Sequence, residues 1–107
     1  DEEALSFVGG YCVVNDVSGR SWQFERPNGG QWVRSKVFDT FLPISPMTPA
    51  SQIKDPQDLT ITTTLNGKVV QHASTKDMIF TVKDILKFLS ISTTLLPGTR
   101  TVMSSLS

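Results

Sequence analysis

Five polar side chains in the first forty positions lie close to large apolar residues in the sequence: Asp16, Arg20, Gln23, Lys36 and Thr40. The first three follow one another in the stretch Asn-Asp-Val-Ser-Gly-Arg-Ser-Trp-Gln, which presents an acid, a base and an amide directly after an apolar run. A surface loop would have this composition, and so would the mouth of an active site. Spacing alone favours a structural role at the surface, because an acid and a base four residues apart form a common exposed helical pair that is worth only a few tenths of a kcal/mol.

Other well-known catalytic and ligand motifs are absent from the sequence. Gly29-Gly30 lacks the Gly-Lys-Ser/Thr ending of a phosphate-binding loop, and no Gly-x-Ser-x-Gly elbow is present. The single histidine, His72, has no cysteine, histidine or acid at ligand spacing, which favours a structural or exposed residue over a metal ligand. The single cysteine, Cys12, lies in an apolar run, where a free cysteine usually packs as a small hydrophobe.

The elements that must position the five polar residues are expected to be short. Residues 1–8 are predicted to form a helix that Gly9-Gly10 ends, and residues 11–15 a buried apolar strand that delivers Asp16 at its end. Residues 17–26 are ambiguous, with a helical turn as one interpretation, and residues 27–30 have the composition of a turn or mobile loop. Three spaced prolines then favour an extended path: Pro43, Pro46 and Pro49.

The second half of the chain carries clearer local signals. Asn66-Gly67 between apolar and threonine-rich runs predicts a β-hairpin over residues 59–72, because both central residues of a type I′ turn need positive φ. Thr81 and Asp84 form a capping-box pattern, and the apolar spacing that follows predicts an amphipathic helix over residues 82–91. Together these elements predict a mixed α+β domain, mainly β, with few helices. A doubly wound parallel sheet is not expected, because strands and helices do not alternate regularly.

Composition limits the class of protein. A chain of 107 residues makes one domain at most, and its 38% apolar and 19% charged residues are those of an ordinary globular protein. Ten basic residues balance ten acidic ones, which removes the electrostatic case for nucleic acid or an anionic membrane as partner. No apolar stretch approaches the roughly 20 residues needed to span a bilayer, and the acidic start does not follow the plan of a signal peptide.

Residues 10–98 resemble the fumarylacetoacetate hydrolase family, and the details look most like the branch called domain-containing protein 2. Each matching block is weak alone, but their order and spacing are specific. The blocks are Gly-Tyr-Cys-Val-Val-Asn-Asp-Val-Ser-Gly-Arg-Ser-Trp-Gln (10–23), Gln-Trp (31–32), Ser-Lys-Val-Phe-Asp-Thr-Phe (35–41), Leu-Asn-Gly (65–67), Val-Gln (70–71), Thr-Lys-Asp-Met-Ile-Phe (75–80) and Leu-Pro-Gly-Thr (96–99).

The resemblance implies a role for each of the five polar residues. Asp16 matches a ligand of a divalent cation, magnesium above all, with manganese or calcium as alternatives. Arg20 and Gln23 match positions that reach toward the substrate, where a guanidinium would bind a carboxylate through two parallel hydrogen bonds. Lys36 matches the active-site lysine, and Thr40 a hydroxyl close to that lysine.

The chemistry that the resemblance implies is metal-dependent hydrolysis of a carbon–carbon bond in a diketo acid, such as an acylpyruvate or a fumarylacetoacetate-like compound. Decarboxylation of oxaloacetate or keto–enol tautomerisation is the alternative, because the same enolate serves all three reactions. A homodimer is implied as well, and the cytosol or the mitochondrial matrix fits a reduced cysteine and a small acidic substrate.

The chain departs from the family pattern at both ends. An upstream Glu-x-Glu pair that supplies two more cation ligands and a downstream Thr-Gly-Thr loop are missing, and Glu2-Glu3 is adjacent rather than alternate. Residues 1–107 are therefore expected to be part of a C-terminal catalytic domain of the fumarylacetoacetase type, which the resemblance implies to be a β-roll, with a hairpin and one or two helices in this part of it. One carboxylate holds magnesium or calcium poorly, so a further interpretation is a catalytically incomplete fragment that only folds or pairs with a full-length relative. Unpaired strand edges and apolar faces are expected to be exposed.

Overall fold

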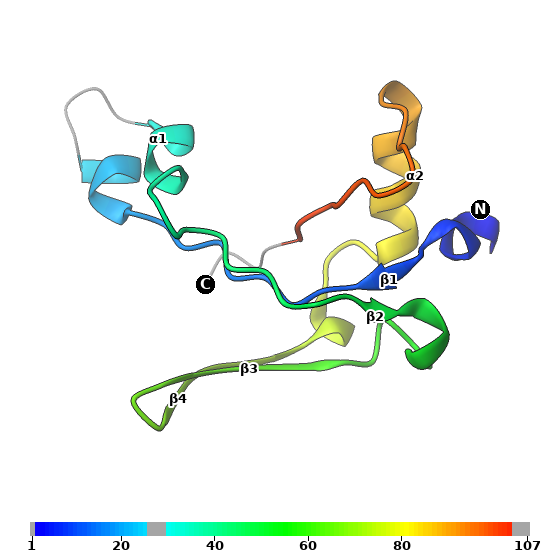
Figure 1. Ribbon diagram of the computed structural model, residues 1–107, viewed down its shortest axis with the longest axis horizontal. Helices are drawn as coiled ribbons and strands as arrows, with labels where there is room; N and C mark the ends of the chain where they lie inside the picture. The colour runs from blue at the N-terminus through cyan, green and yellow to red at the C-terminus, as the bar shows by residue number, and fades with distance from the viewer. Residues whose placement is uncertain (1, 26–29, 104–107) are drawn as a thin grey trace. The chain divides into compact units, whose positions relative to one another are not determined.

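The structure is a computed structural model that describes residues 2–25 and 30–103 (Figure 1). The predicted turn at residues 27–30 lies outside these ranges except for Gly30. The chain divides into two compact units, which are described separately here. The first unit contains the described parts of residues 1–11 and 48–101, and the second those of residues 12–47 and 102–106.

The first unit begins with η1, a 3₁₀ helix over Glu2–Phe7 that confirms the predicted N-terminal helix. The short strand β1 (Gly10–Tyr11) pairs antiparallel with β2 (Thr48–Pro49), and η3 (Ala50–Gln52) follows directly. A backbone hydrogen bond of 3.1 Å from Ala50 N–H to the Gly9 carbonyl extends this contact.

The predicted hairpin is confirmed. Strand β3 (Thr60–Leu65) pairs antiparallel with β4 (Lys68–Ser74) around a turn in which Asn66 has φ 50° and Gly67 φ 77°. Both values are positive, as a type I′ turn requires. The register shifts between Thr63 and Thr64, where β4 carries an extra residue.

The predicted helix is confirmed as α2 (Val82–Ser92), which follows the short η4 (Thr75–Asp77). Thr81 caps it: its hydroxyl accepts from Asp84 N–H at 3.2 Å, and Asp84 Oδ2 accepts from Thr81 N–H at 2.9 Å. Gln57 connects the helix to the end of the hairpin, because its amide oxygen accepts from Val82 N–H at 2.7 Å and its amide nitrogen donates to the Thr75 carbonyl at 3.0 Å.

The second unit contains two neighbouring chain segments. Two backbone hydrogen bonds join them: Asn15 N–H donates to the Pro43 carbonyl at 3.2 Å, and Ser45 N–H donates to the Val13 carbonyl at 2.9 Å. The same unit contains η2, a π-helical turn over Ser21–Glu25 that lies within the region interpreted as a helical turn. It also contains the short helix α1 (Trp32–Lys36), which the sequence did not predict.

Few apolar side chains are buried. Within the described residues Val82 is the buried hydrophobic residue, at 6% exposure, and large apolar side chains are exposed in both units. The predicted strand over residues 11–15 forms only in part, with Val13 68% exposed, and the expected packing of Cys12 as a buried hydrophobe is wrong, since it is exposed. Apolar faces have little to pack on within this length of chain, as the sequence led us to expect. The predicted mixed α+β fold, with a hairpin and short helices, is confirmed. No helix in the described ranges is long and apolar enough to cross a membrane.

Candidate active site

All five predicted site residues lie in the second unit, and four of them lie on two segments that meet through a backbone clasp. Gly19 N–H, in the loop before η2, donates to the carbonyl of Ser35 on α1 at 2.8 Å. Ser35 is fully buried, and its hydroxyl donates to the Trp32 carbonyl at 2.7 Å. Because this clasp holds the loop against α1, side chains about 20 positions apart in the sequence come within hydrogen-bond distance.

An aromatic clamp supports the same contact. The Arg34 guanidinium lies 5.0 Å from the centre of the Trp22 ring and 4.6 Å from that of Phe38, so it sits over one ring from each segment. The loop also approaches Phe38 closely at Gly19, where an added Cβ would lie 3.3 Å from the ring. These contacts fix the loop that carries Asp16 and Arg20 relative to α1.

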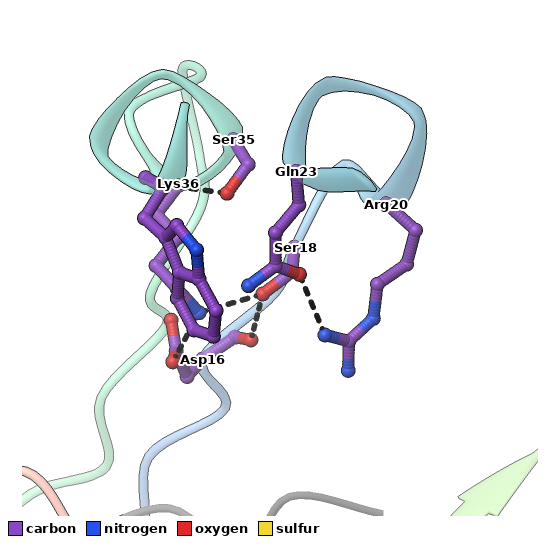
Figure 2. Close-up of polar contacts among 7 residues, drawn as sticks. Asp16, Ser18, Arg20, Gln23, Ser35 and Lys36 are labelled. Atoms are coloured by element: carbon purple, nitrogen blue, oxygen red, sulfur yellow. Dashed lines mark hydrogen bonds and ion pairs between the residues drawn. The ribbon is translucent and has the colours of Figure 1, made fainter. Parts of the chain in front are cut away.

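The central network joins Lys36, Asp16 and Ser18 (Figure 2). Lys36 Nζ donates to Asp16 Oδ2 at 2.6 Å and to Ser18 Oγ at 2.8 Å, and Ser18 Oγ donates in turn to the Asp16 backbone carbonyl at 3.1 Å. The Lys36 and Asp16 side chains are 29% and 25% exposed, so the pair is partly shielded yet open to a ligand. Sequence reasoning missed Ser18, although the quoted stretch contains it two residues after the acid.

A second pair lies on η2 and the residue before it. Arg20 Nη1 donates to Gln23 Oε1 at 2.7 Å. An arginine has no acceptor, so this contact fixes the orientation of the amide: the oxygen faces Arg20 and the Nε2 group points away from it, as Figure 2 shows. Gln23 is fully buried, and Nε2 finds no hydrogen-bond partner among the described residues. A buried donor without a partner costs about 1–3 kcal/mol, and it is what a site offers to an acceptor on a ligand.

Thr40 is not part of this network. Its side chain is exposed, and it makes no hydrogen bond to another described residue. Its backbone has φ 68°, which is rare for a β-branched residue and signals local strain. The predicted role of Thr40 beside the lysine stays a prediction.

The described residues do not make a complete site for a divalent cation. No group of three or more histidine, cysteine, aspartate or glutamate side chains converges in the described part of the chain. Asp16 is the carboxylate of the network, and its Oδ2 already accepts from Lys36. Magnesium and calcium bind tightly only to several oxygens in a fixed arrangement, so the set found here is insufficient by itself.

Comparison with known proteins decides the family. The family model described as fumarylacetoacetate (FAA) hydrolase C-terminal matches residues 1–102. The chain belongs to the fumarylacetoacetate hydrolase family. The resemblance that the sequence blocks indicated is thereby confirmed.

Curated relatives in this family are considerably longer than the chain. A predicted hydrolase of Burkholderia multivorans is 46% identical over 99 residues, which are 92% of this chain and 34% of that protein. A predicted hydrolase of Burkholderia cenocepacia has the same identity and coverage. The chain thus spans about a third of the length of these relatives.

Solved structures of the fumarylacetoacetate hydrolase family share the fold. The 2-hydroxyhepta-2,4-diene-1,7-dioate isomerase of Mycobacterium marinum is 41% identical with a TM-score of 0.77, over 91% of this chain and 36% of that one. The 5-carboxymethyl-2-hydroxymuconate delta-isomerase of Mycobacterium smegmatis is 35% identical, also with a TM-score of 0.77, over 91% of this chain and 37% of that one. Known members are therefore enzymes of the hydrolase and isomerase classes.

Proposed function

We propose that this chain carries the substrate-binding corner of an enzyme that hydrolyses a carbon–carbon bond in diketo acids, of the acylpyruvate or fumarylacetoacetate type. One observation supports it above all: a lysine and an arginine are each held by a polar partner, beside a buried amide donor that has no partner in the described residues. Oxo acids present a carboxylate and ketone oxygens, which are acceptors for such donors.

Each residue has a distinct part in this proposal. Arg20 binds the substrate carboxylate, and Gln23 Nε2 donates to a neighbouring oxygen. When water adds to the distal carbonyl and the carbon–carbon bond breaks, the bonding electrons pass to the fragment that carries the 2-oxo group, as an enolate. The Lys36 ammonium stabilises the negative oxygen of this enolate, because a positioned donor lowers the energy of charge that develops during the reaction.

Keto–enol isomerisation is the second candidate, because the two solved relatives described above are named as isomerases. An isomerase forms the same enolate by losing a proton instead of an acyl group, and Lys36 would stabilise it in the same way. Decarboxylation of oxaloacetate, which also leaves an enolate, belongs to this second group.

The proposal includes Asp16 as a ligand of a divalent cation, magnesium above all, with manganese and calcium as alternatives. Because Asp16 is the one carboxylate of the network and no group of three or more potential ligand side chains converges in the described residues, the remaining ligands would come from outside them. Titration of magnesium into the chain by calorimetry, with Asp16→Ala as control, tests this point. Micromolar binding that Asp16→Ala abolishes would show that this chain completes an Asp16 site, and no binding would show that the other ligands come from elsewhere. Binding that survives Asp16→Ala would contradict the assignment of Asp16 as a ligand.

Turnover with two substrates separates the reactions. The purified chain is incubated with acetylpyruvate or oxaloacetate, and the release of acetate or carbon dioxide is compared with simple loss of the enol. We expect acetate and pyruvate from acetylpyruvate, with a rate that Lys36→Met lowers by at least about a hundredfold and that Lys83→Met, in the first unit, leaves unchanged. Enol loss without cleavage would favour the isomerase. Turnover that is insensitive to Lys36→Met would contradict both.

Partner subunits are a separate proposal. Exposed apolar side chains in both units favour association, either as a homodimer or, if the chain is a catalytically incomplete fragment, with a full-length relative. Sedimentation analysis of the purified chain measures the homodimer directly. A monomer at micromolar concentration would argue against it.

A further inference from the structure

Ser18 is a residue for which the proposed chemistry has so far given no role, although its hydroxyl touches both members of the Lys36–Asp16 pair. We propose that Ser18 is a positioning residue that fixes the direction of the Lys36 ammonium beside Asp16. The effect of Ser18 on catalysis rests on the proposed function, whereas its positioning of Lys36 follows from the hydrogen bonds alone.

The hydrogen bonds of the hydroxyl have a defined direction. Ser18 Oγ has one hydrogen, and that hydrogen is directed to the Asp16 carbonyl 3.1 Å away. The oxygen therefore meets Lys36 Nζ, at 2.8 Å, as an acceptor. A backbone carbonyl two residues earlier thus orients the serine, and the serine orients the lysine.

A second contact changes what the ion pair with Asp16 does. Lys36 Nζ sits at the end of four rotatable bonds, and a single contact with one carboxylate oxygen leaves it free to swing around that oxygen. Contacts to Asp16 Oδ2 and to Ser18 Oγ together define the direction of the third N–H bond of the ammonium. Among the described residues this third hydrogen has no acceptor, so it is available to a substrate oxygen.

A purely local role for Ser18 makes a different prediction. If the hydroxyl only stabilised its own loop through the Asp16 carbonyl, its removal would loosen the loop and leave the ion pair with Lys36 in place. If it positions the lysine, its removal frees the ammonium even when the loop and the clasp at Gly19 stay intact. The two roles are therefore distinguishable at Lys36 Nζ itself.

The experiment records ¹H–¹⁵N spectra of the lysine ammonium groups of the full 107-residue chain at low temperature, with Lys36→Arg to assign the signal of Lys36. Ser18→Ala removes the hydroxyl and Ser18→Thr keeps it. Ser90→Ala is the matched control, because its hydroxyl donates to a backbone carbonyl at 2.9 Å in the first unit. Tryptophan fluorescence reports whether each variant keeps the fold of the second unit.

We expect a resolved, slowly exchanging Lys36 signal in the wild-type chain, in Ser18→Thr and in Ser90→Ala, and its loss in Ser18→Ala. A signal that persists unchanged in Ser18→Ala overturns the proposal. Loss in both Ser18 variants overturns it too, because the loop and not the hydroxyl would then hold the lysine. A wild-type chain without a resolved Lys36 signal likewise contradicts it, because the contact would not persist in solution.

Turnover gives a second readout where the chain is active. Ser18→Ala should lower kcat about tenfold with little change in KM, because a misdirected ammonium affects the enolate more than the bound substrate. Ser18→Thr should restore most of this loss. Absence of turnover in the wild-type chain would count against the proposed function and leave the spectroscopic result as the test of Ser18.

Discussion

Replacing Gln23 with methionine should separate stability from function. The side chain is fully buried, and its Nε2 has no partner in the described residues, which costs about 1–3 kcal/mol relative to a paired amide. Methionine has a similar volume and no polar atom, so Gln23→Met removes this cost. It also removes the 2.7 Å bond from Arg20, but Arg20 is exposed and can bond to water instead, so that this loss is about 1 kcal/mol. The balance is a gain of about 1 kcal/mol in the free energy of unfolding.

Urea unfolding followed by tryptophan fluorescence measures this gain in the right place, because both tryptophans, Trp22 and Trp32, lie in the second unit. A gain of about 1 kcal/mol raises the midpoint by about 0.5 M urea for a slope of about 2 kcal/mol/M. The exposed Gln31→Met is the matched control and should change stability by less than about 0.5 kcal/mol.

Affinity for an oxo acid should move in the opposite direction. If Nε2 donates to a ligand oxygen, Gln23→Met weakens binding about tenfold while it stabilises the chain. Loss of stability by more than about 1 kcal/mol with unchanged ligand affinity would contradict the role of Nε2 as an unpartnered donor, because the amide would then have a structural partner. Equal stability and equal affinity would refute the assignment of Nε2 as a ligand donor.

Three further changes test local structure, the first beside the site and the other two in the first unit. Arg34→Met removes two ring contacts, each worth about 0.5–1 kcal/mol at an exposed site. It should therefore lower the urea midpoint measured by tryptophan fluorescence, and an unchanged midpoint would show that the clamp does not hold the loop. Gly67→Ala should destabilise the hairpin by about 1 kcal/mol, because Gly67 has φ 77°; an added Cβ meets no atom within 4 Å, so backbone strain is the whole cost. Hydrogen exchange of the hairpin amides measures the loss, and a neutral effect would contradict the turn geometry. Hydrogen bonds from Thr81 lower the pKa of Asp84 in the folded chain. The ionised Asp84 carboxylate therefore stabilises the helix above the unfolded pKa near 3.8, and this stabilisation is lost as pH falls through the lower folded value. Circular dichroism should show α2 weakening on acidification below about pH 4, and weakening less in Asp84→Asn. An identical pH profile in Asp84→Asn would contradict the cap.

Local structure was predictable where a few neighbouring residues determine it. The Asn66-Gly67 turn follows from the need for two positive φ values, and both are observed. The helix that begins after Thr81 follows from a cap whose two hydrogen bonds lie within four residues. Neither depends on contacts with distant parts of the chain, which is why the sequence alone was sufficient.

Elements that depend on distant contacts were harder to predict. The five-residue helix α1 is too short to be stable by propensity and depends on the buried Ser35 and on the Arg34 clamp. The strand predicted over residues 11–15 forms only in part, because its apolar residues find little to pack on within the described chain. Hydrophobic pattern indicates which residues favour burial, but not what covers them.

The candidate site also combines contacts that could be predicted with contacts that could not. Asp16 and Lys36 are 20 positions apart, and their contact at 2.6 Å could be anticipated from family resemblance but not from spacing. Spacing suggested a pair between Asp16 and Arg20, whereas Arg20 in fact donates to Gln23. Ser18 was overlooked because a serine in a polar loop has no distinctive pattern until its hydrogen bonds are seen.

The most direct test of the account is whether this chain binds an oxo acid through Lys36 and Arg20. Acetylpyruvate is titrated into the ¹⁵N-labelled chain, and the amide shifts are followed in the wild type, in Lys36→Met, in Arg20→Met and in the control Lys83→Met. We expect saturable shifts confined to the loop of residues 16–20, η2 and α1. Lys36→Met and Arg20→Met should abolish them, and Lys83→Met should retain them. Shifts in the first unit alone, or binding that survives both Lys36→Met and Arg20→Met, would contradict it.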